Sequence, residues 1–252
     1  MVIPFEPHRF RDAAAEYLAG RAPYAPRLFE RIALLCRLDQ TSRVLDLGCG
    51  PGQIARALAP LVGHVVGVDP ERNMLDVARA AAPQLEWIEA SSYELAALAL
   101  RDLALVTMGR AFHWMDRRAT LAELDRMIAR DGAVALISDD HPDVPANAWH
   151  VAFKAITDRF GEADPAKAMR KANWLTHEAV LLDSPFCELE TISVVCSRRV
   201  TIDSLVARTR TMSSVRAHAA DFEAELRETL APFEPITEVT ASKALLARRP
   251  TA

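Results

Sequence analysis

The chain has 252 residues and a mass of 27.8 kDa, and half of its residues are hydrophobic while a quarter are charged. This composition excludes an intrinsically disordered chain. The net charge of −4 and the isoelectric point of about 6.0 argue against a general nucleic-acid binder. The cysteines are too few for a disulfide scaffold and lack zinc-ligand spacing, so no metal site is expected. They are Cys36, Cys49, Cys187 and Cys196.

The first twenty residues lack the apolar core and the cleavage site of a signal peptide. No stretch of about 18 apolar residues occurs along the chain, so no membrane span is expected. Together with the unpaired cysteines, these features predict a cytoplasmic protein.

Two helices are predicted before the first strand. Apolar residues recur at helical spacing from Phe10 to Leu18 and from Leu28 to Cys36, and prolines fix the turn over residues 21–26. We expect residues 1–30 to form a lid over a site in the following domain.

Short apolar runs alternate with helical patterns over residues 40–140. Strands are predicted at 43–47, 64–69, 85–90, 103–108 and 133–138, with helices at 53–61, 71–82 and 117–129. Strands separated by helices of this length imply right-handed crossovers and a parallel sheet. Because the strands are apolar throughout, both faces of the sheet should be covered.

The pattern changes after residue 140. Apolar stripes at 149–160 and 222–233 predict helices whose apolar faces pack on the sheet. Longer strands are predicted at 188–200 and 239–247, and we expect them to complete the first sheet. The prediction is a single domain over 1–252, of α/β class, with a doubly wound, mostly parallel seven-stranded sheet. Residues 141–182 and 201–235 are expected to be helical additions that shape an acceptor site.

A glycine-rich loop follows the first strand. Gly48, Gly50 and Gly52 allow the backbone to turn sharply and to approach a ligand closely. The helix after the loop presents free N–H groups and the positive end of its dipole. Such a loop suits a nucleotide cofactor.

The residues around the loop distinguish between cofactors. The dinucleotide fingerprint fails when counted from Gly48, and from Gly50 it survives only in the variant that ends in Ala55. Asp46 would repel a diphosphate but suits a ligand with a cationic amine, such as S-adenosylmethionine. Asp69 ends the next strand, where a carboxylate can accept hydrogen bonds from both ribose hydroxyls.

These motifs resemble those of the class I S-adenosylmethionine-dependent methyltransferases. The resemblance includes Asp46-x-Gly48-x-Gly50-x-Gly52 and the strand ending at Asp69. The segments 21–26, 73–75 and 111–114 are similar to those of the type-11 small-molecule group, which includes trans-aconitate methyltransferase-like proteins. The resemblance is strong over residues 40–140 and weak beyond them.

The resemblance implies S-adenosyl-L-methionine as the cofactor, with contacts distributed along the chain. It assigns the methionine moiety to Asp46 and to the loop of Gly48, Cys49, Gly50 and Gly52, and the carboxylate of that moiety to Tyr17 and Arg21. It assigns the ribose to Asp69 and the adenine region to Pro70, Met74, Ser91 and Ser92. Met108, at the end of the fourth strand, is a further predicted cofactor residue. Ser91 replaces the usual aspartate of the family, and Ala104 is a second departure. Cys49 can also be read simply as a small loop residue.

The segment after the fourth strand supplies candidates for the acceptor site. His113 is a candidate general base, although a structural histidine is the simpler interpretation. Trp114 is a candidate wall of the pocket or a packing residue. Arg110 could hold a carboxylate through two hydrogen bonds, or it could form a salt bridge within the protein.

The predicted function is methyl transfer to a small-molecule acceptor by in-line displacement. Alternatives are an S-adenosylmethionine-binding protein without transferase activity and a nicotinamide-dependent oxidoreductase that uses the frame from Gly50. A nucleic-acid methyltransferase is disfavoured by the acidic charge balance. Neither the acceptor nor the oligomeric state follows from the sequence.

Overall fold

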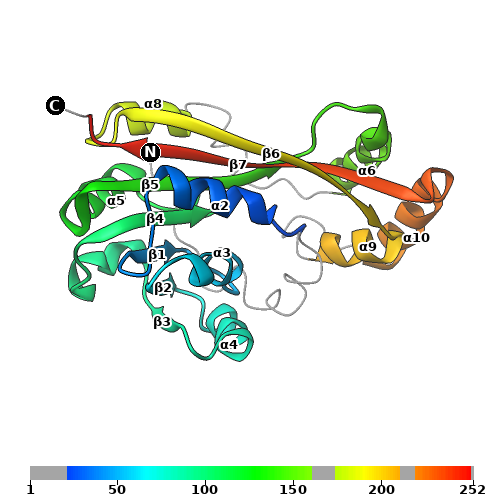
Figure 1. Ribbon diagram of the computed structural model, residues 1–252. Coiled ribbons are helices and arrows are strands. Elements are labelled where there is room, and N and C mark those ends of the chain that lie inside the picture. Colours follow the sequence, from blue (N-terminus) through cyan, green and yellow to red (C-terminus); the bar gives the residue numbers. More distant parts are fainter. Residues whose placement is uncertain (1–21, 161–173, 211–218, 251–252) are drawn as a thin grey trace.

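A seven-stranded sheet with helices on both faces forms the centre of the computed structural model, which describes residues 22–160, 174–210 and 219–250 (Figure 1). The strand order is β3-β2-β1-β4-β5-β7-β6. The bounds are β1 Arg43–Leu47, β2 His64–Asp69, β3 Glu86–Glu89, β4 Leu103–Gly109, β5 Ile128–Asp140, β6 Glu188–Val200 and β7 Ile236–Arg248. Strands β1 to β5 are parallel, and β7 runs antiparallel to both of its neighbours. The predicted sheet is therefore confirmed, including its completion by the last two strands.

Helices connect the parallel strands and extend the molecule beyond them. The bounds are α2 Pro26–Leu35, α3 Gln53–Leu58, α4 Arg72–Ala81, α5 Arg117–Met127, α6 Ala148–Arg159, α8 His177–Leu182, α9 Ile202–Arg210 and α10 Ala219–Leu230. The short 3₁₀ helices η2 (Ser92–Leu98) and η3 (Phe112–Trp114) follow β3 and β4. Within the described ranges, no helix has the length and apolar character needed to cross a membrane. The predicted helix at 10–18 lies outside the described residues.

Two apolar layers hold the sheet between helices. On one face, α2 and α3 bury Leu28, Ile32 and Leu58 against the strands. On the other face, α5 and α8 contribute Leu124 and Leu181 to a second cluster. Because both faces are covered, β1, β2 and β4 are buried along nearly their whole length, as their apolar sequences predict.

Strand β5 begins earlier than predicted. The helix expected to end at residue 129 ends at Met127, and β5 starts at Ile128. Asp131 and Gly132, a pair typical of a turn, lie instead within β5, at an irregularity where Leu103 pairs with Ile128 but Leu105 pairs with Ala133. Pairing with β4 overrides the local turn signal of the Asp-Gly pair, because the backbone groups on either side gain strand partners.

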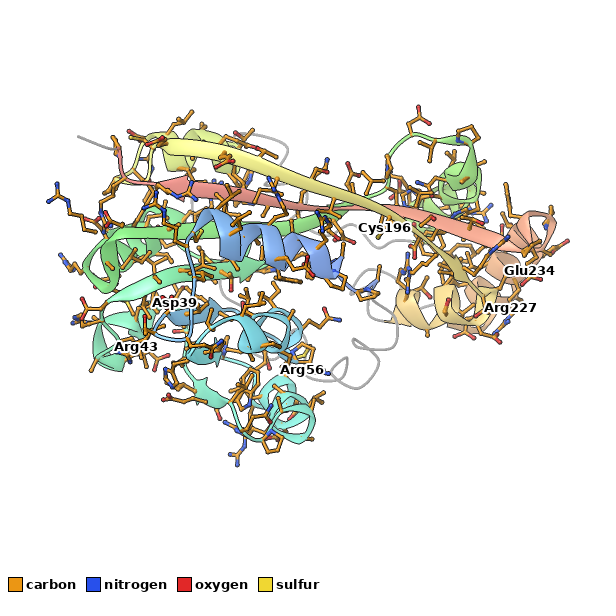
Figure 2. All side chains as sticks on the ribbon, viewed as in Figure 1. Asp39, Arg43, Arg56, Cys196, Arg227 and Glu234 are labelled. Atoms are coloured by element: carbon orange, nitrogen blue, oxygen red, sulfur yellow. The ribbon has the colours of Figure 1, made fainter. Side chains whose placement is uncertain are left out.

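A third apolar cluster lies at the far end of the two last strands. Strands β6 and β7 have 13 residues each, whereas β1 to β4 have four to seven, so the longer strands project beyond the parallel sheet (Figure 1). Helices α6, α9 and α10 pack there around Trp149, Phe222 and Ile236. We call this cluster the distal core. On its outer side, Arg227 of α10, labelled in Figure 2, contacts Asp203 of α9 at 2.7 Å.

The packing of helices α6 and α10 in the distal core differs from the prediction. The apolar stripes of residues 149–160 and 222–233 were expected to pack on the sheet as the other helices do. They pack instead on each other and on the projecting ends of β6 and β7, around Val200 and Ile236. The indole Nε1 of Trp149 donates a hydrogen bond to the carbonyl of Thr237 at 3.1 Å. Helical periodicity identifies an apolar face, but it does not identify what that face covers.

Candidate functional site

The loop between β1 and α3 is shaped by three glycines in the left-handed region of backbone conformation. Their φ angles are +69° at Gly48, +53° at Gly50 and +79° at Gly52. A Cβ added at Gly48 would lie 2.5 Å from the Cβ of Ala111, and one added at Gly52 would lie 2.5 Å from the ring of Trp87. A Cβ at Gly50 would have no atom within 4 Å. Two glycines are therefore required by packing, while the third borders open space that another group could occupy.

Asp69 ends β2 beside this open space. Its Oδ2 accepts a hydrogen bond from the backbone N–H of Gly50 at 2.8 Å, and its Oδ1 accepts one from the N–H of Glu71 at 2.9 Å. The residue is 7% exposed, and burial raises the pKa of the carboxyl to about 6. Since each carboxylate oxygen has two lone pairs, both oxygens can still accept a hydrogen bond from a ligand hydroxyl.

Asp46 lies on β1, and its side chain is fully buried. Its Oδ1 accepts from the hydroxyl of Thr107 on β4 at 2.8 Å, and its Oδ2 accepts from the N–H of Ala55 on α3 at 3.1 Å. Burial raises the pKa of Asp46 to about 7, and the charge of Asp69 adds to this effect. These hydrogen bonds connect Asp46 on β1 to β4 and to α3, and they fix the loop between them. The charge of Asp46 can also attract a bound cation across the loop. The sequence analysis did not identify Thr107, which is an ordinary strand residue by composition.

Four other predicted cofactor residues lie close to the loop or to the strand ends. Cys49 is buried in the loop, and burial raises the pKa of its thiol, so it is a neutral small residue there. Pro70 is half-buried directly after Asp69. Met74 on α4 and Met108 on β4 are buried, with Met108 in the apolar cluster that includes α5.

Ser91 and Ser92 start the 3₁₀ helix η2 and are half-buried. The Ser91 hydroxyl donates to the Oε2 of Glu94 at 2.8 Å, and its backbone N–H contacts the same oxygen at 2.8 Å. This reciprocal capping arrangement gives Ser91 a local structural role. The two remaining predicted cofactor residues, Tyr17 and Arg21, lie outside the described residues.

Arg110 follows β4 in an uncommon backbone conformation, with a φ of +54°. Its Nε donates to the Oδ1 of Asp139 at 2.5 Å, and its guanidinium lies 4.8 Å from the ring centroid of Tyr24. Of the two interpretations that the sequence left open, the structure shows the internal salt bridge. Left-handed conformations of residues other than glycine cluster at functional sites, so the strand end remains a candidate.

The histidine and tryptophan after β4 lie in an aromatic cluster. The rings of His113 and Trp114 are 4.6 Å apart, and His113 stacks at 6.5 Å on His177 of α8. Phe112 lies 5.2 Å from the same imidazole. The sequence analysis missed His177 because about sixty residues separate it from the β4 segment and no short motif connects the two.

Known proteins share the segment that contains this loop. Residues 44–132 match the family model described as a methyltransferase domain. Residues 44–132 are a methyltransferase domain. The matched segment runs from β1 to the start of β5, so it includes the glycine loop, Asp69 and the aromatic cluster after β4. The family predicted from the sequence is thereby confirmed.

Curated relatives of the methyltransferase domain include two trans-aconitate 2-methyltransferases. The one from Enterobacter sp. is 32% identical over 156 residues, which are 60% of this chain and 58% of the relative. The one from Azoarcus sp. is 36% identical over 113 residues, or 44% of each chain. An uncharacterized methyltransferase of Schizosaccharomyces pombe is 30% identical over 51% of each chain. The chain spans about half the length of the curated relatives it matches.

Solved structures match over nearly the whole chain and show the fold. A proposed type II methyltransferase from Anaeromyxobacter dehalogenans aligns with a TM-score of 0.69 at 24% identity, covering 91% of this chain and 97% of the other. An S-adenosylmethionine-dependent methyltransferase from Thiobacillus denitrificans, in complex with S-adenosyl-L-homocysteine, aligns with a TM-score of 0.51 at 16% identity over 99% and 100%. The [4+2]-cyclase SpnF has a TM-score of 0.54 at 13% identity over 97% and 95%. Since a cyclase shares the fold, the function has to be argued from the site.

Proposed function

We propose that this chain transfers a methyl group from S-adenosyl-L-methionine to a small-molecule acceptor. The observation that carries the proposal is the carboxylate of Asp69, which is held against the N–H of Gly50 beside open space at the end of β2. Two oxygens with free lone pairs at that position suit the two hydroxyls of a ribose. The methyltransferase domain match over residues 44–132 supports the same cofactor.

The charges around the loop favour a cationic ligand over a phosphorylated one. Asp46 and Asp69 flank the loop, and within the described residues neither carboxylate forms an ion pair with a basic side chain. A diphosphate at the loop would meet two nearby carboxylates and be repelled. An ammonium or a sulfonium would instead relieve their mutual repulsion, so the residues present fit S-adenosylmethionine.

The described residues would bind and orient the reactants. Asp69 and the backbone of the loop would hold the cofactor, and buried Met108 and Phe112 would exclude water at the end of β4. When bound, the cofactor supplies an electrophilic methyl group on a sulfonium sulfur. Holding an acceptor in line with that methyl group can supply most of the acceleration. His113 would act as a general base only for an acceptor that must lose a proton.

The parts outside the matched segment would complete the acceptor site. We propose that residues 1–30 cover the site and that the helices after residue 140 shape the space for the acceptor. The support for the helices is the position of α6, α9 and α10 beyond the carboxyl ends of the parallel strands, where open α/β sheets bind their ligands (Figure 1). The support for residues 1–30 is Tyr24, whose ring lies beside the guanidinium of Arg110 at the end of β4. The acceptor is proposed to be a small molecule because the relatives named above include methyltransferases of trans-aconitate.

Calorimetric titration tests the cofactor. We expect S-adenosyl-L-homocysteine to bind and NADH not to bind. In Asp69→Asn, the affinity for S-adenosyl-L-homocysteine should fall about 100-fold, because hydrogen bonds to a charged group each contribute about 1.5–3 kcal/mol. Asp76→Asn is the matched control, since Asp76 is exposed and pairs with Arg79 on the surface of α4. Tight binding of NADH without binding of S-adenosyl-L-homocysteine would establish the oxidoreductase alternative.

Transfer of a labelled methyl group separates an enzyme from a binding protein. We expect label to move to a member of a panel of small acids, amines and phenols, with trans-aconitate included. A protein that binds S-adenosyl-L-homocysteine but labels no acceptor in the panel would support the second candidate, binding without transfer. This candidate is kept because the cyclase SpnF shares the fold, so the fold alone does not establish methyl transfer.

A further inference from the structure

Arg117 is the first residue of α5 and is 9% exposed. Its Nη1 donates to the carbonyl of Leu175 at 2.8 Å, and its guanidinium carbon lies 3.8 Å from the ring centroid of Trp174. The same Nη1 lies 3.3 Å from the Nδ1 of His177. Within residues 22–160, 174–210 and 219–250, Arg117 forms no ion pair with a carboxylate. A buried guanidinium is therefore held by a carbonyl, an imidazole and an aromatic face.

Three other arginines of the fold each pair with an acidic side chain. Arg110 pairs with Asp139, and Arg208 pairs with Glu238 inside the distal core. Arg118, the next residue along α5, is exposed and pairs with Asp183. Burying a charge without a partner is costly, and burial accordingly lowers the pKa of Arg117. Within the described residues, no carboxylate therefore neutralises Arg117, and its charge is available to bind an anion.

The contact with Arg117 fixes the proton on His177. An arginine only donates hydrogen bonds, so the Nδ1 of His177 accepts and the ring proton lies on Nε2. Burial and the charge of Arg117 lower the pKa of His177, which keeps the ring neutral. The rings of Phe112 and His113 pack beside it at centroid distances of 5.2 and 6.5 Å. The cluster thus combines one fixed positive charge with one oriented N–H donor.

We propose that Arg117 and His177 bind an anionic oxygen group, a carboxylate or a phosphate, on the methyl acceptor. The pair lies beside η3, which follows β4 at the carboxyl end of the parallel strands, next to the loop proposed to hold the cofactor. Arg110, which the sequence offered as a candidate for this role, forms a salt bridge with Asp139. The inference rests on the proposed methyl transfer, because it concerns the acceptor of that reaction.

Anion titrations at constant ionic strength test the subsite. The full chain is saturated with S-adenosyl-L-homocysteine, and inorganic phosphate or trans-aconitate replaces chloride in steps. We expect one of these anions to bind saturably by calorimetry and to raise the pKa of the His177 ring, followed by NMR with His177→Gln for assignment. A response to trans-aconitate alone identifies a carboxylate site, and a response to phosphate alone identifies a phosphate site.

Variants of the two neighbouring arginines localise the effect. Arg117→Gln should weaken anion binding at least tenfold and Arg117→Lys by less, because lysine keeps the charge but loses the planar donors. Arg118→Gln should leave anion binding unchanged. Absence of saturable binding of both anions to the unmodified chain, or equal binding to the chain and to Arg117→Gln, would overturn the subsite.

Binding of S-adenosyl-L-homocysteine separates the two proposals. It is measured first on the unmodified chain and on each arginine variant, where it also reports correct folding. If the unmodified chain does not bind S-adenosyl-L-homocysteine, the proposed function fails. If it binds S-adenosyl-L-homocysteine but neither anion, only the subsite fails.

Discussion

In the part of the chain that the structure describes, buried carboxylates occur at two places, and their surroundings differ. In the distal region, Glu238 on β7 is fully buried and contacts three basic side chains. These are His141 at 2.9 Å, Arg198 at 2.7 Å and Arg208 at 2.7 Å. Hydrogen bonds and charges from these groups hold the pKa of Glu238 well below its usual range. At the glycine loop, the described donors to Asp46 and Asp69 are all neutral, and burial raises both pKa values.

A counter-ion within the protein separates structural charges from charges that are candidates for ligand binding. Glu238 is fully neutralised by the protein, so it ties strands to a helix and needs no ligand. Among the described residues, Asp46 and Asp69 have no basic counter-ion, and Arg117 has no acidic counter-ion. Strongly perturbed groups without an internal counter-ion are candidates for ligand contact. On this criterion, the carboxyl end of the parallel strands is the proposed functional part of the molecule, and the charges around Glu238 have a structural role.

The largest effect is expected from removing the carboxylate of Glu238, which contacts three basic side chains. Glu238→Ala leaves Arg208 buried without a counter-ion, so the free energy of unfolding should fall by about 3–5 kcal/mol, measured by urea denaturation. The affinity of the folded variant for S-adenosyl-L-homocysteine should be unchanged. Glu190→Ala removes an exposed ion pair with Arg248 and should cost about 1 kcal/mol or less. A loss of cofactor affinity in folded Glu238→Ala would show that the charges around Glu238 belong to the binding site.

A smaller effect is expected from the glycines of the loop, and it should divide into two kinds. Gly52→Ala places a methyl group 2.5 Å from the ring of Trp87 and should destabilise the fold by about 1–3 kcal/mol. Gly50→Ala meets no atom within 4 Å, so its cost should be limited to the left-handed backbone, about 1–2 kcal/mol. Only Gly50→Ala should abolish binding of S-adenosyl-L-homocysteine while the chain stays folded, measured by calorimetry beside thermal unfolding. Retained affinity would mean that the open space at Gly50 is not the cofactor site.

The smallest effect is expected from pH. Asp46 and Asp69 have pKa values of about 7 and about 6, and the α-ammonium group of S-adenosyl-L-homocysteine prefers their ionised forms. Protonation therefore competes with binding, so the affinity for S-adenosyl-L-homocysteine should rise by about threefold to tenfold from pH 6 to pH 8, with release of protons. Calorimetry in buffers of different ionisation enthalpy measures both quantities. Asp46→Asn should flatten the profile, and an affinity that falls with rising pH would contradict the assignment.

Local patterns in the sequence determined most of the parallel sheet and the position of the loop. Apolar runs bounded by glycine or proline predict β1 and β2 within a residue, because those strands are buried on both faces and their composition alone marks them. The glycines at 48, 50 and 52 and the carboxylates at 46 and 69 are likewise visible, since the backbone conformation and the strand ends follow from short segments. The start of β5 was missed because pairing with β4, which is distant in sequence, overrides the Asp-Gly turn signal.

Which charges are neutralised depends on how the chain folds. Arg110 and Arg117 are seven residues apart and equally basic, yet Asp139 on β5 engages the first while the second meets Trp174 and His177 after a long stretch of chain. Likewise, only folding brings β7, β6 and α9 around Glu238 and turns the apolar stripes of α6 and α10 toward each other. The order of charged and apolar groups along the chain can be read directly from the sequence. Their partners depend on contacts between segments far apart in sequence, and these contacts exist only in the folded molecule.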